Sequence, residues 1–330
     1  MVTANKTSRK VWAYETVPGT AEIVAVGTTT YEFGEYTNEA EKWNNYYTEN
    51  PVEAYWNYAS RTPTLTELEK RFPTFREVFN PTTAQHLAQM LKNPSAGPPV
   101  AITTLDSGVT YPLTIRLEEK GGTVPTNSQA VGCYNVGLYG RMLRGNAYIV
   151  EQEFAWQKLE DLGDNPILTT SPYPAGSGAT STVTGTYKGN PECKWNNVAV
   201  TPVYRAEYWI AQEHEIVSGS EGASQTVDLH KVQPCDIKLA GILEDDAVWD
   251  DYVDRAERTL ILKVYKANMT NYIQLTFTNA HMISQIKTGI RNKGHYESIC
   301  TLKAEQVNVT SDFAVESSET FATHFKGAVP

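Results

Sequence analysis

A glutamate–histidine–glutamate triplet and a cluster of aspartates come closest, in this sequence, to a catalytic or metal-binding pattern. Glu213, His214 and Glu215 supply ligand and acid–base groups, but strand alternation would place the glutamates on one face and the histidine on the other. The aspartates are Asp245, Asp246, Asp250, Asp251 and Asp254. They lack the central glycine and the final glutamate of an EF-hand loop, so we interpret them as a solvated helix face or an interface with a basic neighbour.

Other signatures of catalysis or cofactor binding are missing from the sequence. No phosphate-binding glycine loop and no nucleophile elbow occurs in a usable context, and the six histidines are scattered. The cysteines form no CxxC pair, and we expect them to be reduced and mostly buried: Cys133, Cys193, Cys235 and Cys300. We therefore predict no catalytic residue, no metal and no cofactor. A carboxylate pair from distant strands, as in glycosidases, stays open at this point.

The charge balance argues against a protein that grips nucleic acid. The chain has 28 basic and 38 acidic residues, a formal net charge of −10, whereas phosphate binding needs clustered Lys and Arg. The polar residues 1–10 lack the apolar core of a signal peptide, and no apolar run approaches the ~20 residues of a membrane helix. We expect a soluble protein made in the cytoplasm.

Strand patterns dominate the elements that must position these residues. The clearest is Tyr272–Thr278, where three apolar residues alternate with polar ones, and Pro112–Glu118 alternates in the same way. Two further strands, 134–139 and 147–156, flank a glycine-containing turn and predict a hairpin. Short helices are predicted at 64–71, at 83–91 between prolines, and at 245–255, which is acidic at its start. The fold class is therefore mainly β.

Two stretches read as long extended loops. Residues 36–58 are polar and aromatic, and a loop of this length in a compact domain usually meets a partner. Residues 170–189 are rich in Gly, Ser, Thr and Pro and predict a flexible linker or arm. The aromatic residues of the first loop either cover the core of their own domain or contact another molecule: Trp43, Tyr46, Tyr47, Tyr55 and Trp56.

The two sides of the second stretch repeat one order of elements, namely strand, helix and then three strands. We therefore predict two tandem β-sandwich or partial-barrel domains, each with a short flanking α-helix. The predicted boundaries are 1–169 for the first domain, 170–192 for the linker or arm, and 193–330 for the second domain with a C-terminal arm.

Three motifs of the sequence carry a family resemblance. One is the early Tyr14-Glu15-Thr16-Val17-Pro18-Gly19-Thr20, and another is Ser60-Arg61-Thr62-Pro63 after a variable loop. The third is Gly132-Cys133-Tyr134-Asn135-Val136-Gly137-Leu138, followed by Gly145 and the strand 150–156. With these motifs the chain resembles the major tail tube proteins of long-tailed, siphovirus-like bacteriophages and archaeal tailed viruses. The chain is longer than single-fold members and is similar to those that fuse two tube folds.

This resemblance implies a structural virion protein and not an enzyme. Subunits would join edge to edge into stacked rings around a hollow lumen, and two folds per chain would need three chains where one fold per chain would need six. DNA would pass through the lumen without specific binding, and the other partners would be the tape-measure and tail-end proteins. The protein would reside in the virion tail, and the absence of a sheath-like domain favours a non-contractile tail.

The resemblance also gives the candidate residues a role. An acidic lumen repels phosphate, so four glutamates either line the lumen or lie on a solvated outer face: Glu118, Glu119, Glu151 and Glu153. The aromatic loop 36–58 and the linker are candidates for contacts between rings. Two alternatives stay open: another virion β-protein, such as a tail terminator or capsid decoration, and a carbohydrate-binding β-sandwich with platforms at Trp43, Trp56 or Trp209.

Overall fold

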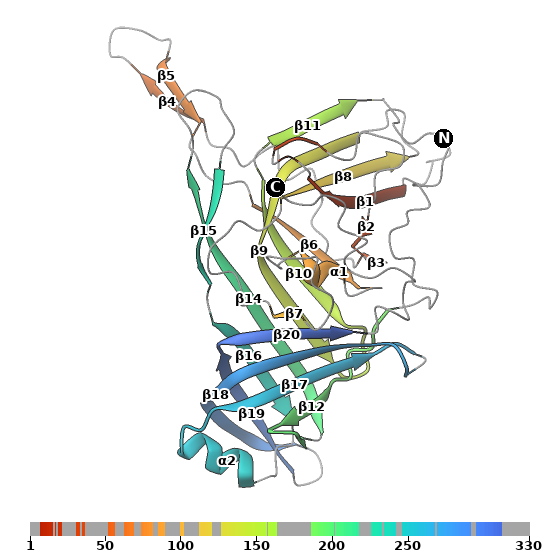
Figure 1. Cartoon of the computed structure of the whole chain (residues 1–330), viewed down its shortest axis with the longest axis vertical. Coiled ribbons are helices and arrows are strands. Elements are labelled where there is room, and N and C mark those ends of the chain that lie inside the picture. The colour runs from red at the N-terminus through yellow and green to blue at the C-terminus, as the bar shows by residue number, and fades with distance from the viewer. Residues whose placement is uncertain are drawn as a thin grey trace.

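The computed structural model describes the strands, the helices and the turns that join most of them. The described residues are 7–15, 17, 19–21, 31–33, 35–36, 52–56, 63–68, 74–81, 85–89, 100–101, 112–120, 127–156, 158–163, 186–200, 202–217, 226–232, 234–241, 246–267, 269–291 and 295–311. They form a mainly β protein, as the sequence predicts, and every strand pairing among them is antiparallel (Figure 1).

Three layers of strands share two long strands, β9 (Asn127–Leu143) and β18 (Tyr272–Arg291). The upper sheet has the order β2-β1-β8-β9-β11, with β2 (Tyr31–Glu32), β1 (Thr7–Tyr14), β8 (Leu113–Lys120) and β11 (Lys158–Gly163). The first residues of β9 lie in this sheet. Its remaining residues bend away into a second sheet, so one strand belongs to two layers (Figure 1).

The second layer, the central sheet, has the order β3-β6-β10-β9-β14-β16-β19-β18 and crosses the whole molecule (Figure 1). Its other strands are β3 (Glu35–Tyr36), β6 (Thr74–Asn80), β10 (Ile149–Ala155), β14 (Val203–Val217), β16 (Cys235–Gly241) and β19 (His295–Ala304). The predicted hairpin at the glycine turn is confirmed as β9–β10.

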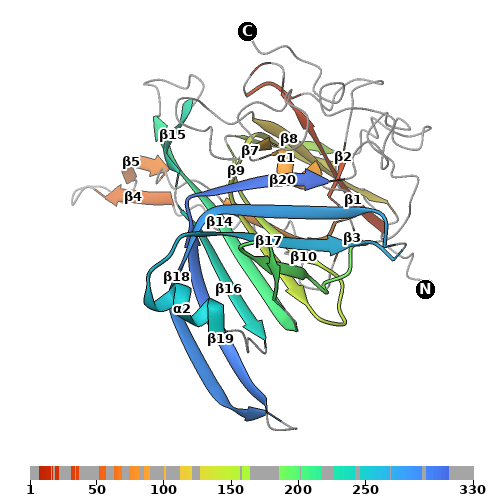
Figure 2. The same ribbon diagram turned by 60° about the horizontal axis from the view of Figure 1, so that its bottom comes forward.

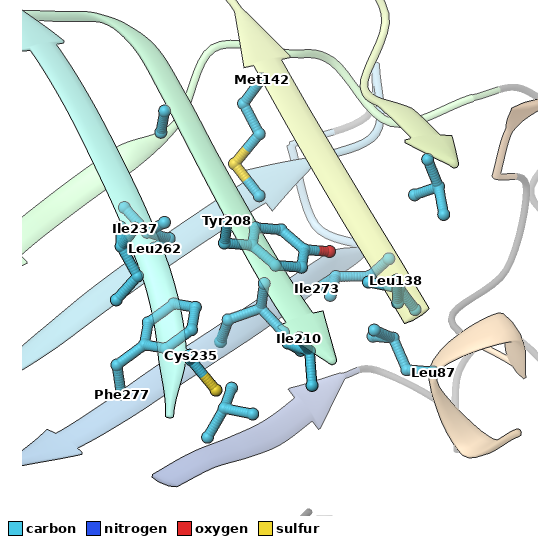
Figure 3. Packing of buried hydrophobic residues seen from close by; sticks show 14 of the residues in the cluster. Leu87, Leu138, Met142, Tyr208, Ile210, Cys235, Ile237, Leu262, Ile273 and Phe277 are labelled. Atoms are coloured by element: carbon cyan, nitrogen blue, oxygen red, sulfur yellow. The ribbon is translucent and has the colours of Figure 1, made fainter. Parts of the chain in front are cut away.

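The third layer, the lower sheet, has the order β13-β12-β17-β18-β20-β7. Its strands are β12 (Glu192–Trp195), β13 (Val198–Ala199), β17 (Arg258–Tyr265), β20 (Gln306–Ser311) and β7 (Val100–Ala101), together with the first residues of β18. Part of the core lies between this sheet and the central sheet, and the same core includes Trp12, Leu113 and Ile115 of the upper sheet. Figure 3 shows Tyr208, Ile210 and Ile237 packed against Leu262 and Phe277.

The two halves of the chain use the same pairing pattern, down to the irregularities. β8, β9, β10 and β11 correspond to β17, β18, β19 and β20, because each set forms the same chain of antiparallel pairs. The β8–β9 pair has a register shift between Leu113 and Ile115, and the corresponding β17–β18 pair has one between Arg258 and Leu260. In the β9–β10 pair, β9 has one extra residue at Val136, and in the β18–β19 pair, β18 has one at the corresponding position, Ile283.

The flanking elements continue the correspondence. β1 pairs with β8 as β12 pairs with β17, and this places Trp12 opposite Ile115 and Trp195 opposite Leu260. Both tryptophans are buried. A helix follows β6 and β16 in turn: α1 (Gln85–Ala88) in the first half and α2 (Asp246–Val253) in the second. Both helices fall inside predicted helical segments.

Two predicted elements are wrong. Residues 64–71 were predicted to be helical, but β5 (Pro63–Leu68) pairs instead with β4 (Val52–Trp56) in a separate two-stranded sheet. The β-branched Thr64 and Thr66 alternate along this segment and favour a strand. β4 also lies inside the predicted aromatic loop 36–58. The alternation in β8 predicts one solvated face, but Thr114 and Arg116 are as fully buried as Leu113 and Ile115, so both faces of this part of β8 are covered.

The segment between the halves is described only from residue 186 onward. Tyr187 is buried, and its carbonyl accepts a hydrogen bond from the Tyr148 amide at 2.9 Å. The Lys188 amide donates to the Tyr265 carbonyl at 2.8 Å, and Ala147 forms a β-bridge with Lys188. The last residues of the predicted linker therefore contact both halves. Residues 170–185 lie outside the described residues.

Candidate assembly surfaces

The two halves meet by strand pairing along what we call the internal seam, formed by β9 residues 137–143 and β14 residues 205–211. Seven residue pairs run from Arg205 opposite Leu143 to Ala211 opposite Gly137. Figure 1 shows β9 and β14 side by side along the middle of the molecule. The seam makes the sheets of the two halves continuous, so backbone hydrogen bonds and not only side-chain packing hold the halves together.

Two glycines of β9 allow the close approach of aromatic residues across the seam. A Cβ at Gly140 would overlap the ring of Tyr208, which lies directly opposite. A Cβ at Gly137 would lie 3.0 Å from Cζ2 of Trp209. Glycine in a strand interior often marks a site where another group approaches closely. The spacing of Gly137 and Gly140 was the available sequence signal for this seam.

The core side of the seam is closed by a pair of tyrosines. Tyr148 and Tyr208 are fully buried, and their hydroxyl groups share a short hydrogen bond. Burial raises the pKa of Tyr148 and raises that of Tyr208 well above its ordinary value. Both phenols therefore stay neutral, as a buried hydrogen-bonded pair requires.

The opposite face of the seam is polar. Tyr139 packs against Trp209 with ring centroids 6.2 Å apart. Burial and a hydrogen bond to Glu207 raise the pKa of Tyr139 to about 12. Glu207 also forms an ion pair with Arg205 at 2.5 Å and lies opposite Arg141 across the seam. This face carries charges of both signs.

Two of the candidate lumen residues lie on that same polar face. Glu151 and Glu153 alternate with the buried Gln152 along β10, and Glu151 lies opposite Tyr139. Glu151 also forms an ion pair with Arg76 of β6. Glu118 and Glu119 are instead consecutive positions of β8 in the upper sheet. The structure thus brings Glu151 and Glu153 together on one face and places the other pair in a different sheet.

The aromatic candidates for contacts between rings are described only in part. Tyr55 and Trp56 end β4, in the β4–β5 hairpin that extends from the rest of the fold in Figure 1. Trp43, Tyr46 and Tyr47 lie outside the described residues. Trp209, the remaining proposed glycan platform, packs over Gly137 and Tyr139 at the internal seam.

The early glutamate motif forms a buried anchor that the sequence did not reveal. The Glu15 carboxylate accepts hydrogen bonds from the amides of Gly19 and Gly132, both at 2.7 Å, and from the Thr114 hydroxyl at 2.9 Å. Gly19 and Gly132 have positive φ angles of 76° and 67°, which suit glycine. One carboxylate therefore fixes the end of β1 to β8 and β9. This contact links the first and third resemblance motifs physically.

Asp251, one of the residues that came closest to a chemical site, has structural partners. Asp251 of α2 accepts a hydrogen bond from Trp195 Nε1 at 2.7 Å and pairs with Arg258 at 2.8 Å. Burial raises the pKa of Asp251, but hydrogen bonds from Arg258 and Trp195 outweigh that effect and leave the pKa below its ordinary value. Asp251, one member of the aspartate cluster, thus docks α2 onto the lower sheet. His214 lies in β14, where the pairing with β15 (Thr226–Val232) shifts register.

Two further properties bear on ligands and membranes. Within the ranges that the structure describes, His, Cys, Asp and Glu side chains form no group of three or more that could hold a metal ion. No helix in the described part of the chain has the length and apolar character to cross a membrane. The four cysteines are buried and unpaired with one another.

The far end of the central sheet is an exposed edge, which we call the β18 edge, residues 281–291. Among the described residues this part of β18 pairs only with β19. Figure 2 shows the β18–β19 hairpin projecting from the molecule. Two large apolar side chains on this edge are exposed, Ile283 at 44% and Ile286 at 57%. Exposed edges of this kind are normally blunted by charge or covered, because they invite pairing with another chain.

Comparisons with known proteins give only distant structural neighbours. No family model matches the chain, and no curated protein matches it. The anti-feeding prophage cap, a tube-terminating cap, is similar over 37% of this chain and 88% of its own, with 12% identity and a TM-score of 0.31. A chain of the sheath–tube complex of PVC, an extracellular contractile injection system in its extended state, is similar over 43% and 99%, with 12% identity and a TM-score of 0.33.

Proposed function

We propose that this chain is a structural subunit of a viral tail tube, which assembles with copies of itself into stacked rings around a channel for DNA. The observation that carries the proposal is the internal seam. Two units with the same strand pairing are joined edge to edge by β9 and β14 into one continuous sheet. The chain therefore contains, within itself, the kind of junction that a ring of such units needs.

The two outer edges of the central sheet, at β3 and β18, support the assembly of further chains onto this one. Antiparallel pairing at the seam is heterologous, because β9 of one unit meets β14 of the other. A heterologous contact generates a closed ring when its rotation closes. With two units in each chain, three chains make a ring of six units, whereas six single units would otherwise be needed.

In the proposed tube, the polar face of the central sheet lines the channel. Glu151 and Glu153 lie on this face, away from the core. Formal charge −10 keeps the subunit from attracting phosphate, so DNA passes without being held. The protein acts through assembly and not through catalysis. Its partners are further copies, the tape-measure protein and the proteins at the tail ends, in the virion tail after synthesis in the host cytoplasm.

Imaging by negative-stain electron microscopy at increasing protein concentration tests this function. We expect hollow tubes or stacked rings, with a ring mass near three chains of 36.7 kDa each. A tail terminator or a capsid decoration would form single rings or small oligomers that do not grow. Isolated particles that bind glycans, and no assembly with or without a tail-initiation complex, would instead support the carbohydrate-binding alternative.

A further inference from the structure

The internal seam is a template for the contact between two separate chains, because the strands on its two sides have counterparts elsewhere in the fold. On one side, β9 pairs with β10 and offers its other edge to β14. The counterpart of β9 is β18, which pairs with β19 in the same way. Extra residues at Val136 and Ile283 align the two hairpins, so that Tyr139 of the seam corresponds to Ile286.

The β18 edge therefore stands where the seam edge of β9 stands in the first half. In β9 that edge is covered by seven residue pairs with β14. In β18, no strand among the described residues pairs with the corresponding edge, and Ile286 is 57% exposed where Tyr139 packs against Trp209. An exposed isoleucine at the position of a packed aromatic residue indicates a surface that an incoming strand covers.

The other side of the template identifies the incoming strand. β14 pairs with β16 starting from Val203 opposite Gly241. In the first half, β6 corresponds to β16, since both pair with the second strand of the hairpin. The strand on the outer edge of β6 is β3, where Tyr36 lies opposite Phe79. β3 is thus the first-half counterpart of the start of β14.

We propose that the β18 edge of one chain pairs antiparallel with the first half of a second copy, at the central-sheet edge where β3 lies. This contact repeats the internal seam between chains and makes the second copy the partner of the β18 edge. It rests on the proposed function, because it specifies which edges close the ring. The contact is heterologous, so each chain presents one edge and accepts the other.

A matched pair of lysine substitutions tests the edge. Ile286→Lys places a charge on the proposed interface, and lysine is the residue that blunts natural sheet edges. Val198→Lys is the control, because Val198 is 57% exposed, like Ile286, and lies in β13 of the lower sheet, outside both proposed edges. We expect Ile286→Lys to raise the concentration needed for assembly at least ~tenfold, equivalent to about 1.4 kcal/mol. Val198→Lys should assemble like the wild type.

Hydrogen exchange of the wild-type assembly gives a second readout that does not depend on a variant. Amides of residues 281–291 should exchange at least ~tenfold more slowly in the assembly than in the isolated chain. Tubes whose β18 edge gains no protection, or unchanged assembly of Ile286→Lys, would overturn the edge assignment and leave the tube function standing. A wild-type chain that never assembles, even with tail-initiation proteins, would overturn both.

Discussion

Replacement of Gly140 by alanine tests the close approach on which the internal seam depends. The added Cβ would overlap the Tyr208 ring, which is fully buried and hydrogen-bonded to Tyr148, so the ring has no free direction in which to move. Overpacking of a buried site costs about 1–3 kcal/mol, and the loss of the tyrosine hydrogen bond adds about 1 kcal/mol. Alanine returns roughly 0.5–1 kcal/mol by restricting the unfolded chain. We expect a net loss of about 1–3.5 kcal/mol.

The measurement is the free energy of unfolding in urea, with Gly137→Ala as the matched control. Gly137 lies three residues earlier in the same strand, and its added Cβ would contact the half-buried Trp209 ring at 3.0 Å, so a smaller loss of about 1 kcal/mol is expected. The decisive step repeats Gly140→Ala in a Tyr208→Ala background, where the methyl group has room. An equal loss with and without the Tyr208 ring would refute the proposed packing.

Three further predictions concern the buried polar groups. Glu15→Gln should lower the free energy of unfolding in urea by about 2–3 kcal/mol. The new amide nitrogen must face at least one group that now donates a hydrogen bond to the carboxylate. A loss below about 0.5 kcal/mol would contradict the anchor of three hydrogen bonds. Burial raises the pKa of Tyr148, so its contribution to stability is complete below pH ~10 and falls by up to ~1.4 kcal/mol per pH unit above it. Tyr148→Phe should make the free energy of unfolding less dependent on pH between pH 9 and 11. An unchanged pH dependence would argue against the buried phenol. Burial also raises the pKa of all four cysteines, so a thiol reagent at pH 8 should label them only in denaturant, and rapid labelling of the native chain would contradict their burial.

Local periodicity was enough to find most of the strands that carry the core. In Tyr272–Thr278 the predicted inward residues Ile273, Leu275 and Phe277 are all fully buried, because one face of this strand packs against the central sheet. The same reasoning failed for β8, where both faces are covered and the polar Thr114 is buried against Glu15. Alternation of apolar and polar residues identifies a strand with one buried face, but it does not identify a strand whose two faces are both buried.

The site was less accessible to sequence reasoning, because it is made by pairing between distant segments. Gly140 and Tyr208 are far apart in the chain, and the local sequence pattern of neither strand predicts which strand it pairs with. The glutamates chosen for their charge divide between two sheets for the same reason. The β18 edge was missed because the sequence predicts a strand only over Tyr272–Thr278, whereas β18 continues to Arg291.

The pairing of β1 with β8 has a consequence for how the chain folds during synthesis. β1 ends at Tyr14 and its partner begins at Leu113, so about 99 residues must be added before the two strands can meet. At roughly 5–20 residues per second this delay lasts about 5–20 s, and the glycine amide of residue 132 that anchors Glu15 emerges later still. Throughout that interval β1, whose Trp12 is buried in the folded protein, lacks its β8 partner. Nascent chains stalled before residue 113 should therefore be the ones that recruit chaperones and aggregate.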